Sequence, residues 1–288
     1  MDFYNNLTVL QNEIVLPFDY SFGVPMLVSW IVTFLFCIIL IDAELMNKKI
    51  SFLVYLITII VGGLLLGGTP NAVMPIQQIL TTLSIKAEVG YLLPAIITLC
   101  VLLTSSILIG RIFCGFACPL GALQEIISKI NFKTDLKAQK KVKYRIEVSS
   151  QTPTIIRWIF LGILILFVFW GISLLPVFNP FSGFSFLKTP SEQTLLLPFF
   201  GLTIVCIASV FMYRPWCRFL CPFGAGSSFC SQFARSKYQR TEDCTECGLC
   251  EEICPTQEAA KESKKSECYY CNRCIEICPH NAIKLNLG

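Results

Sequence analysis

The chain has 288 residues, of which 54% are hydrophobic and 15% are charged, and its mean hydropathy is +0.64. A soluble globular domain rarely has this composition, so it indicates an integral membrane protein. The net charge of +4 is small and gives no reason to expect a nucleic-acid partner.

Five apolar stretches are long enough to cross a hydrocarbon core, which takes about 20 helical residues. They cover residues 24–43, 50–68, 91–113, 158–177 and 194–213, and the second is the shortest. The sequence therefore predicts a mainly α fold, with a polytopic transmembrane helix bundle of about five spans.

Lysine and arginine predict the orientation, because basic residues near the ends of spans are retained on the cytoplasmic side. Two basic residues follow the first stretch, nine lie between positions 111 and 157, and ten lie between 214 and 284. Only Lys86 and Lys188 fall on the opposite side. We therefore expect a multi-pass protein of the cell inner (cytoplasmic) membrane, with its N-terminus outside and its C-terminus in the cytoplasm.

Two outside-facing loops are candidate borders of a pocket for a quinone headgroup. Residues 67–85 are typical of a short amphipathic or re-entrant element, and residues 179–184 are typical of a turn between spans. Neither loop has a carboxylate or histidine nearby to take a proton. Menaquinone is therefore a candidate cofactor without a defined site.

A twin motif follows two of the apolar stretches. The segments RIFCGFACPLGA, at 111–122, and RPWCRFLCPFGA, at 214–225, share one pattern, and each ends a stretch that runs from outside to inside. Parallel repeats of this kind commonly build a symmetric site between them. Because residues at i and i+4 share one face of a helix, each motif presents two sulfur atoms in one direction before the proline turns the chain. The candidate ligands are Cys114, Cys118, Cys217 and Cys221.

Four facing thiolates in these CxxxCP motifs are expected to hold a third iron–sulfur cluster at the cytoplasmic boundary. The alternatives that stay open are a redox-active dithiol, a site for a soft metal ion such as Cu(I), and a helix end with buried thiols. Arg111 and Arg214 either neutralise the charge of such a site or follow the positive-inside rule, and we slightly favour the second interpretation.

Eight further cysteines lie in the runs CTECGLCEEICP, from Cys244, and CYYCNRCIEICP, from Cys268. Each run has the C-x2-C-x2-C-x3-C-P spacing of bacterial ferredoxins, in which three thiolates hold one cubane and the fourth reaches the other. We therefore expect two 4Fe–4S clusters with crossed ligand sets. The first set is Cys244, Cys247, Cys250 and Cys278, and the second is Cys268, Cys271, Cys274 and Cys254. A zinc site or a disulfide knot fits less well, since zinc favours separated pairs and the cytoplasm is reducing.

Other notable residues are expected to be structural. Cys37, Cys100 and Cys206 lie alone inside apolar stretches, where cysteine packs as a small hydrophobe. His280, the only histidine, is expected to be a turn residue, and residues 282–287 are expected to form a strand that closes the ferredoxin domain.

The expected domain organisation has three parts. Residues 1–23 form an extracytoplasmic N-terminal segment, and residues 24–240 form the transmembrane bundle with the two CxxxCP repeats. Residues 241–288 form a C-terminal bacterial-type ferredoxin domain of the α+β class with two 4Fe–4S clusters.

The order of GRIFCGFACPLGA, NPFSG, RPWCRFLCPFGA and the paired ferredoxin runs resembles the NapH-type membrane polyferredoxins, the membrane component of quinol dehydrogenases. The NosR-type and CcoG-type iron–sulfur membrane proteins are related to that family. The resemblance covers residue 50 onward and implies electron transfer between the menaquinol pool and a partner protein, through clusters exposed to the cytoplasm. The additional stretch at 24–43 departs from the four-span pattern of the family and leaves the terminal acceptor open.

Electron transfer is therefore the first functional hypothesis, and any enzymatic activity would come from quinol oxidation. No hydrolytic triad, phosphate loop or dinucleotide fingerprint is recognisable. A copper reductase or an assembly factor for a respiratory enzyme is the alternative, with the CxxxCP cysteines as soft ligands. A docking platform with structural clusters is a third hypothesis. The expected partners are the lipid bilayer, a redox subunit or ferredoxin, and quinone.

Overall fold

The computed structural model describes residues 48–84, 92–130, 151–188, 190 and 196–286, together with residues 28, 31, 32 and 35. The predicted N-terminal segment 1–23 and most of the predicted span 24–43 lie outside these residues, as does Cys37. The fold below is that of the described ranges.

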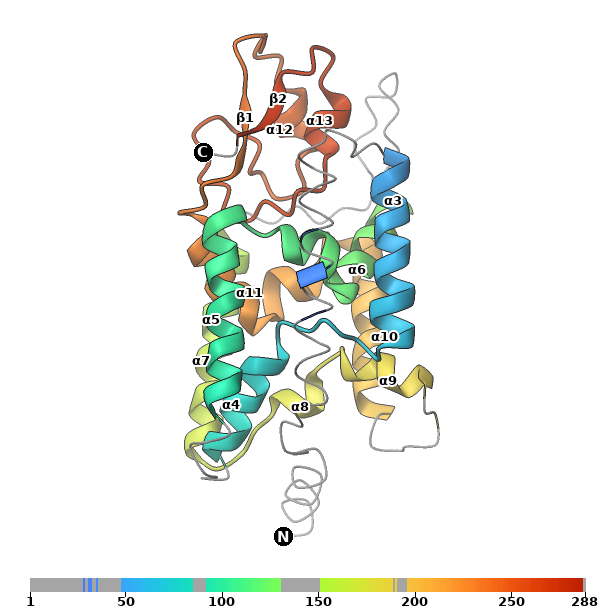
Figure 1. Ribbon diagram of the computed structural model, residues 1–288, viewed down its shortest axis with the longest axis vertical. Coiled ribbons are helices and arrows are strands. Elements are labelled where there is room, and N and C mark those ends of the chain that lie inside the picture. Colours follow the sequence, from blue (N-terminus) through green and yellow to red (C-terminus); the bar gives the residue numbers. More distant parts are fainter. Residues whose placement is uncertain are drawn as a thin grey trace.

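Long apolar helices stand side by side in the bundle (Figure 1). They are α3 (Lys48–Ile57), which continues as the π-helix η1 (Thr58–Leu65), α5 (Leu92–Ile109), α7 (Gln151–Phe169) and α10 (Leu196–Phe211). Each overlaps one of the apolar stretches found in the sequence. The length and predominantly apolar character of these sequences account for the helices, although several contain proline, glycine and β-branched residues.

Two of these helices, over Leu92–Ile109 and Thr152–Phe169, are long and apolar enough to cross a membrane. The apolar helices over Lys49–Leu65 and Leu196–Phe211 are shorter. Large apolar side chains cover their outer faces, and Phe169 at the end of α7 is 82% exposed. The number of five spans stays a prediction.

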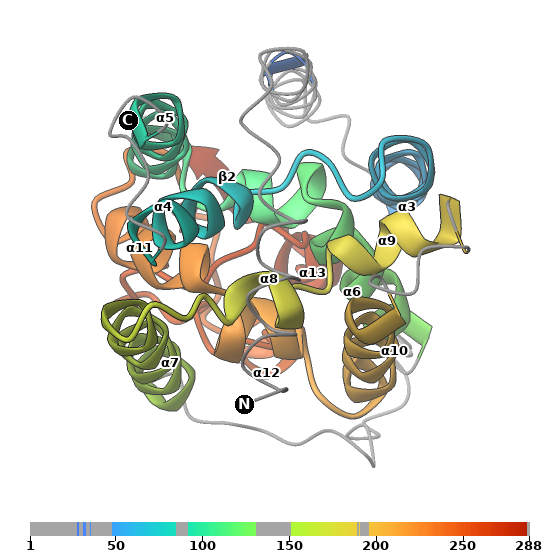
Figure 2. The same cartoon turned by 90° about the horizontal axis from the view of Figure 1, so that it is seen from below.

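Two short helices lie between the long ones and interlock the bundle. The first, α6 (Pro119–Ile130), follows α5 in the chain but packs against α3, η1 and α10. The second, α11 (Pro222–Ser231), follows α10 but packs against α5 and α7. Figure 2 shows this exchange, with α11 on the side of α5 and α7 and α6 on the side of α3 and α10. Each CxxxCP repeat therefore completes the opposite half of the bundle.

Short helices cover the end of the bundle away from the C-terminus (Figure 1). They are α4 (Met74–Ser84), α8 (Leu175–Phe178) and α9 (Ser182–Lys188). The helix α4 lies within residues 67–85, where a short amphipathic or re-entrant element is expected. Residues 179–184 do not form a simple turn, because α9 begins at Ser182. The Asn179 side chain donates to Gln77 Oε1 at 2.7 Å and ties this segment to α4.

The ferredoxin region lies at the opposite end of the bundle (Figure 1). Its elements are β1 (Lys237–Arg240), α12 (Leu249–Ile253), α13 (Arg273–Ile277) and β2 (Ile283–Asn286). The strands pair antiparallel, with Lys237 opposite Asn286 and Arg240 opposite Ile283. The expected strand in 282–287 is thus confirmed, and its partner β1 begins before the predicted boundary at 241.

Candidate functional site

The two ferredoxin runs have the same local backbone. In each run, the third and fifth positions adopt the left-handed conformation: Glu246 and Gly248 in the first, Tyr270 and Asn272 in the second. Glycine and asparagine tolerate this conformation better than most residues. Successive turns of this type direct backbone N–H groups into a concavity that favours an anion. The runs therefore fit a negatively charged, thiolate-bound group.

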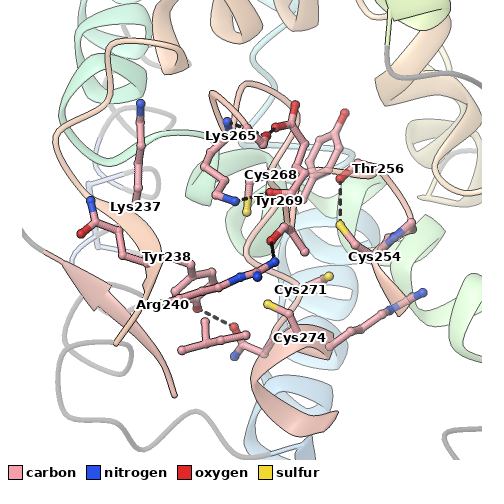
Figure 3. Close-up of a pocket in the computed structure, with 18 of the residues that line it drawn as sticks. Lys237, Tyr238, Arg240, Cys254, Thr256, Lys265, Cys268, Tyr269, Cys271 and Cys274 are labelled. Atoms are coloured by element: carbon pink, nitrogen blue, oxygen red, sulfur yellow. Dashed lines mark hydrogen bonds between the residues drawn. The ribbon is translucent and has the colours of Figure 1, made fainter. Parts of the chain in front are cut away.

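One cavity of about 290 Å³ lies between the second run and the strand β1. Figure 3 shows Cys254, Cys268, Cys271 and Cys274 around it. Cys254 comes from the first run and the other three from the second, so this is the predicted crossed set. Arg240 and Lys237 also line the cavity. The structure brings these four cysteines to one space, while their role as ligands stays a prediction.

A smaller cavity of about 20 Å³ lies beside the first run. It is lined by Cys244, Cys247, Cys250 and Cys278, which form the other predicted set. His280 also lines it and lies in an exposed turn, in agreement with the expected turn position. Cys247 is exposed, so this site lies at the protein surface.

In the described ranges, no three cysteine, histidine, aspartate or glutamate side chains gather closely enough to hold a single metal ion. A cubane does not require such convergence, because each of its irons takes a separate thiolate. The cavity of about 290 Å³ has room for a cluster of several irons, whereas the cavity of about 20 Å³ would have to widen to hold one.

The twin CxxxCP motifs do not form the α-helical turn expected from the i, i+4 spacing. Both are π-helices, η3 (Phe113–Ala117) and η5 (Trp216–Leu220). The last cysteine of each closes a wider i to i+5 turn: Cys118 N donates to Phe113 O and Cys221 N donates to Trp216 O, both at 2.9 Å. These cysteines are extended because proline follows, and the prolines begin α6 and α11. Such π-turns are frequent at functional sites.

The four CxxxCP cysteines are buried in one core cluster with the aromatic residues Phe113, Trp216 and Phe223. The Gln124 side chain of α6 donates to Cys217 Sγ at 3.3 Å, across the two repeats. Gly224 N donates to Cys221 Sγ at 3.4 Å. Two sulfurs of the second repeat thus accept hydrogen bonds from the surrounding protein.

Burial keeps the thiols of Cys118, Cys217 and Cys221 protonated in the absence of a metal ion. It raises the pKa of Cys118 and Cys217, and it raises the pKa of Cys221 to about 12. Negative charge on the neighbouring CxxxCP sulfurs raises the pKa of Cys118 and Cys221 further, because the sulfurs lie near one another. A bound metal deprotonates a coordinating thiol outright. These cysteines are thus soft donors that become thiolate ligands only when metal ions bind.

Two buried carboxylates organise arginines around the CxxxCP cysteines. Glu125 of α6 accepts from Tyr213 at 2.7 Å, from Arg214 Nε at 3.0 Å and from Arg273 at 2.7 Å. Burial alone would raise the pKa of Glu125, but Arg273 and Arg214 lower it to about 2. Glu125 is therefore charged at neutral pH.

Glu267 holds the second pair of arginines. Its carboxylate accepts from Arg111 Nη1 at 2.6 Å and from Arg157 Nη2 at 2.5 Å. Burial opposes the charge, but Arg111 and Arg157 lower the pKa of Glu267 to about 2. With Glu125, the network has four guanidinium groups that share two carboxylates, so its ion pairs leave a net buried charge of +2 (4 − 2). Uncompensated buried charge is costly, so this surplus favours an anionic group nearby.

Buried donors without a partner also point to an anionic occupant. Within the described residues, Arg111 Nε and Nη2 and Trp216 Nε1 are buried and form no hydrogen bond. Arg111 interacts electrostatically with Cys114 and Cys217. Donors of this kind fit a cluster whose sulfur atoms accept hydrogen bonds.

The ferredoxin loop between Cys268 and Cys271 touches the first CxxxCP motif. A Cβ atom on Gly115 would lie 2.3 Å from Tyr269 O, so only glycine permits this approach. The Tyr269 ring centroid lies 4.4 Å from Arg111 Cζ and 4.7 Å from Arg214 Cζ. Tyr269 therefore links two sites by direct contact. One is the cavity that Cys268 lines, and the other is the group of CxxxCP cysteines.

The sequence did not reveal most of this network. From the sequence alone, we interpret Arg111 and Arg214 as ordinary positive-inside residues. That interpretation does not account for the burial of both side chains or for their ion pairs with Glu267 and Glu125. Glu125, Glu267 and Arg157 belong to no motif recognisable in the sequence. A lone acid in the apolar run ALQEII was the available signal for Glu125.

The outer loops do not contribute to either cavity. None of the described residues in 67–84 and 179–184 lines either cavity, and α8 and α9 lie at the other end of the bundle from the ferredoxin region (Figure 1). The quinone pocket expected between them stays a prediction.

Two family models, both described as 4Fe-4S binding domains, match the chain. One matches residues 91–137 and 194–240, which contain the CxxxCP motifs. The other matches residues 238–257 and 264–284, which contain the ferredoxin runs. These matches support iron–sulfur binding in both parts of the chain.

Curated relatives have similar sequences. The uncharacterized protein MJ0750 of Methanocaldococcus jannaschii is 30% identical over 60% of this chain and 69% of its own length. YccM of Escherichia coli, named as a candidate electron transport protein, is 27% identical over 57% of this chain and 46% of its own. The methylamine utilization ferredoxin-type protein MauN of Paracoccus denitrificans is 27% identical over 51% and 48%. The match thus spans about half of YccM and MauN. No solved structure matches the chain.

Proposed function

Since the chain belongs to the same family as MJ0750 and matches two models of 4Fe-4S binding domains, we propose that it is a membrane-embedded electron relay with three four-cysteine sites. Iron–sulfur clusters accept and donate single electrons, and their ligands and hydrogen bonds set their reduction potentials. The residues of this chain hold these groups at fixed positions and in different surroundings.

This proposal rests on one observation: four cysteines line each of the two cavities. Both crossed sets predicted from the sequence line one cavity each. The site of Cys244, Cys247, Cys250 and Cys278 lies at the surface, and Cys268 adjoins the CxxxCP motifs through Tyr269. The order of the sites from the bundle interior to the surface suits electron exchange with a redox partner outside the bundle.

The CxxxCP cysteines form the third site in this proposal. Its support is the two surplus guanidinium charges and the unpartnered donors of Arg111 and Trp216. A thiolate-bound cluster is anionic and balances such a surplus, whereas a disulfide or four neutral thiols would not. The burial of all four thiols also disfavours the alternative of a copper-delivery site, which needs access for a partner.

We place the bundle in the cytoplasmic membrane, with the ferredoxin region in the cytoplasm. The exposed apolar faces of α5, α7 and α10 and the distribution of lysine and arginine support this orientation. The electron donor or acceptor in the membrane is then the menaquinol pool, as in NapH-type proteins. The partner on the cytoplasmic side is a redox subunit or a ferredoxin.

The test uses the full chain in liposomes, purified without oxygen. A menaquinol analogue is added, and the visible absorbance of the clusters is followed. We expect the absorbance to be bleached by menaquinol, or restored by menaquinone after dithionite reduction. Clusters that respond to dithionite but to neither quinone form would contradict the role in the quinol pool.

A further inference from the structure

The second CxxxCP repeat lacks a carboxylate that the first repeat has. Superposing the twin motifs by sequence places Glu125 of α6 opposite Ser228 of α11. Glu125 pairs with Arg214, the motif arginine of the opposite repeat. The related arginine, Arg111, would find only the Ser228 hydroxyl at the equivalent position.

The two arginines occupy related places in the bundle. A Cβ atom on Gly121 would lie 3.4 Å from Arg214 Nη1, and one on Gly224 would lie 3.3 Å from Arg111 Nη2. These glycines are themselves equivalent in the twin motifs. The repeats therefore present the same arginine pocket twice, once with its own acid and once without.

Glu267 of the ferredoxin region fills the pocket that lacks the acid. It accepts from Arg111 and Arg157, and it is also hydrogen-bonded to Ser228. The side chains of Arg111, Arg157 and Glu267 are almost completely buried. Glu267 precedes Cys268 directly and lies two residues from Tyr269, whose hydroxyl donates to Cys217 O at 3.4 Å.

We propose that Glu267 is a positioning residue that supplies, from the ferredoxin region, the carboxylate that the second repeat lacks. Arg111 and Arg157 remain buried without a counter-ion until the ferredoxin region docks, and docking fixes the loop of Cys268 and Cys271 against the CxxxCP motifs. Removing one partner from a buried ion pair is strongly destabilising, so the docked arrangement is the stable one. This proposal rests on the proposed function only in assuming that these cysteines hold iron–sulfur clusters.

The test moves the carboxylate from the ferredoxin region to α11 in the full chain. Three variants are compared with the wild type: Glu267→Ser, Ser228→Glu, and the double variant Ser228→Glu, Glu267→Ser. Thermal unfolding in detergent is measured for each. We expect each single variant to lose about 10 °C, because Glu267→Ser leaves two buried arginines unpaired and Ser228→Glu forces a larger side chain into a buried position beside Glu267. The double variant should recover at least half of the loss.

The magnetic interaction between reduced centres, measured by electron paramagnetic resonance, is the second readout. It should weaken in Glu267→Ser and return in the double variant, because the loop of Cys268 regains its place. Glu267→Gln, which keeps the shape of the side chain, should resemble Glu267→Ser.

Glu258 provides the matched control. It is a buried ferredoxin carboxylate that accepts from Glu267 N at 3.0 Å and from Ser266 but forms no ion pair with a bundle arginine in the described chain. Ser228→Glu should not rescue Glu258→Gln. Two results would overturn the proposal. One is a double variant with a thermal stability no higher than that of the less stable single variant, and the other is a Glu267→Gln protein as stable as the wild type. If the purified wild-type protein contained no iron, the proposed function would be contradicted. The unfolding temperatures of the Glu267 and Ser228 variants could still be compared.

Discussion

Glu125 of α6 joins the second CxxxCP motif and the ferredoxin region through ion pairs. It is completely buried and pairs with both Arg214 and Arg273. We expect Glu125→Gln to lower the free energy of unfolding by about 3–5 kcal/mol, because two buried guanidinium groups lose their counter-ion. Denaturant unfolding in detergent measures the change.

Glu251→Gln is the matched control for that change. Glu251 pairs with Arg240, but its side chain is 48% exposed. The control should cost less than about 1 kcal/mol, since solvent screens an exposed pair. Equal losses in the two variants would contradict the central role of the buried network.

Gly115 determines how closely the ferredoxin loop approaches the first CxxxCP motif. A Cβ atom at this position would lie 2.3 Å from Tyr269 O. Gly115→Ala should therefore destabilise the protein by about 1–3 kcal/mol through forced displacement of the loop. Gly162→Ala in α7 is the control, because its Cβ would meet no atom within 4 Å and should be neutral or stabilising in thermal unfolding.

The cysteine sets were predictable at the residue scale, whereas their surroundings were not. The spacing of the ferredoxin runs is enough to predict the crossed sets that share the two cavities. The pairing of Glu267 with Arg111 joins residues 156 positions apart, and no local pattern encodes it. Long-range ion pairs of this kind depend on how the repeats interlock.

Among the elements, α11 has an inverted distribution of polarity. Ser227, Ser228 and Ser231 are buried, while Phe229 is 56% exposed and Phe233, just after the helix, is 64% exposed. In water this arrangement would be unfavourable, but it is suited to a helix whose outer face contacts lipid. We therefore expect α11 to lie at the depth of the acyl chains.

Brominated lipids test this placement. The fluorescence added by Phe229→Trp should be quenched in liposomes with brominated acyl chains. Tyr238→Trp, at a buried position in β1, is the control and should be unaffected. Equal quenching at both positions, or none at Phe229→Trp, would contradict the placement of α11 in the bilayer.

The long helices and the last strand followed from apolar composition, whereas the π-turns did not. The i, i+4 spacing of the CxxxCP cysteines predicts an α-helical face, but both motifs wind into η3 and η5. The proline after each motif favours an extended cysteine, and the backbone reaches that conformation through a wider turn. The crossing of α6 and α11 into the opposite halves also depends on tertiary packing.

At the scale of the whole molecule, one network of buried ion pairs joins the ferredoxin region to the bundle. The ferredoxin region is joined to the bundle through Glu267 and Arg273, and the bundle is interlocked through α6 and α11. Such a network predicts that the ferredoxin region and the bundle unfold together. Differential scanning calorimetry should give one transition, and two well-separated transitions would contradict this.

The most direct test of the central claim is the quantification of iron and sulfide in the anaerobically purified full chain, with electron paramagnetic resonance. We predict about twelve irons per chain, about four for each set of four cysteines. The variant Cys114→Ser, Cys217→Ser should keep about eight irons and lose one spectral signal. About eight irons in the wild type, with unchanged content and spectra in the variant, would contradict a third cluster between the CxxxCP motifs.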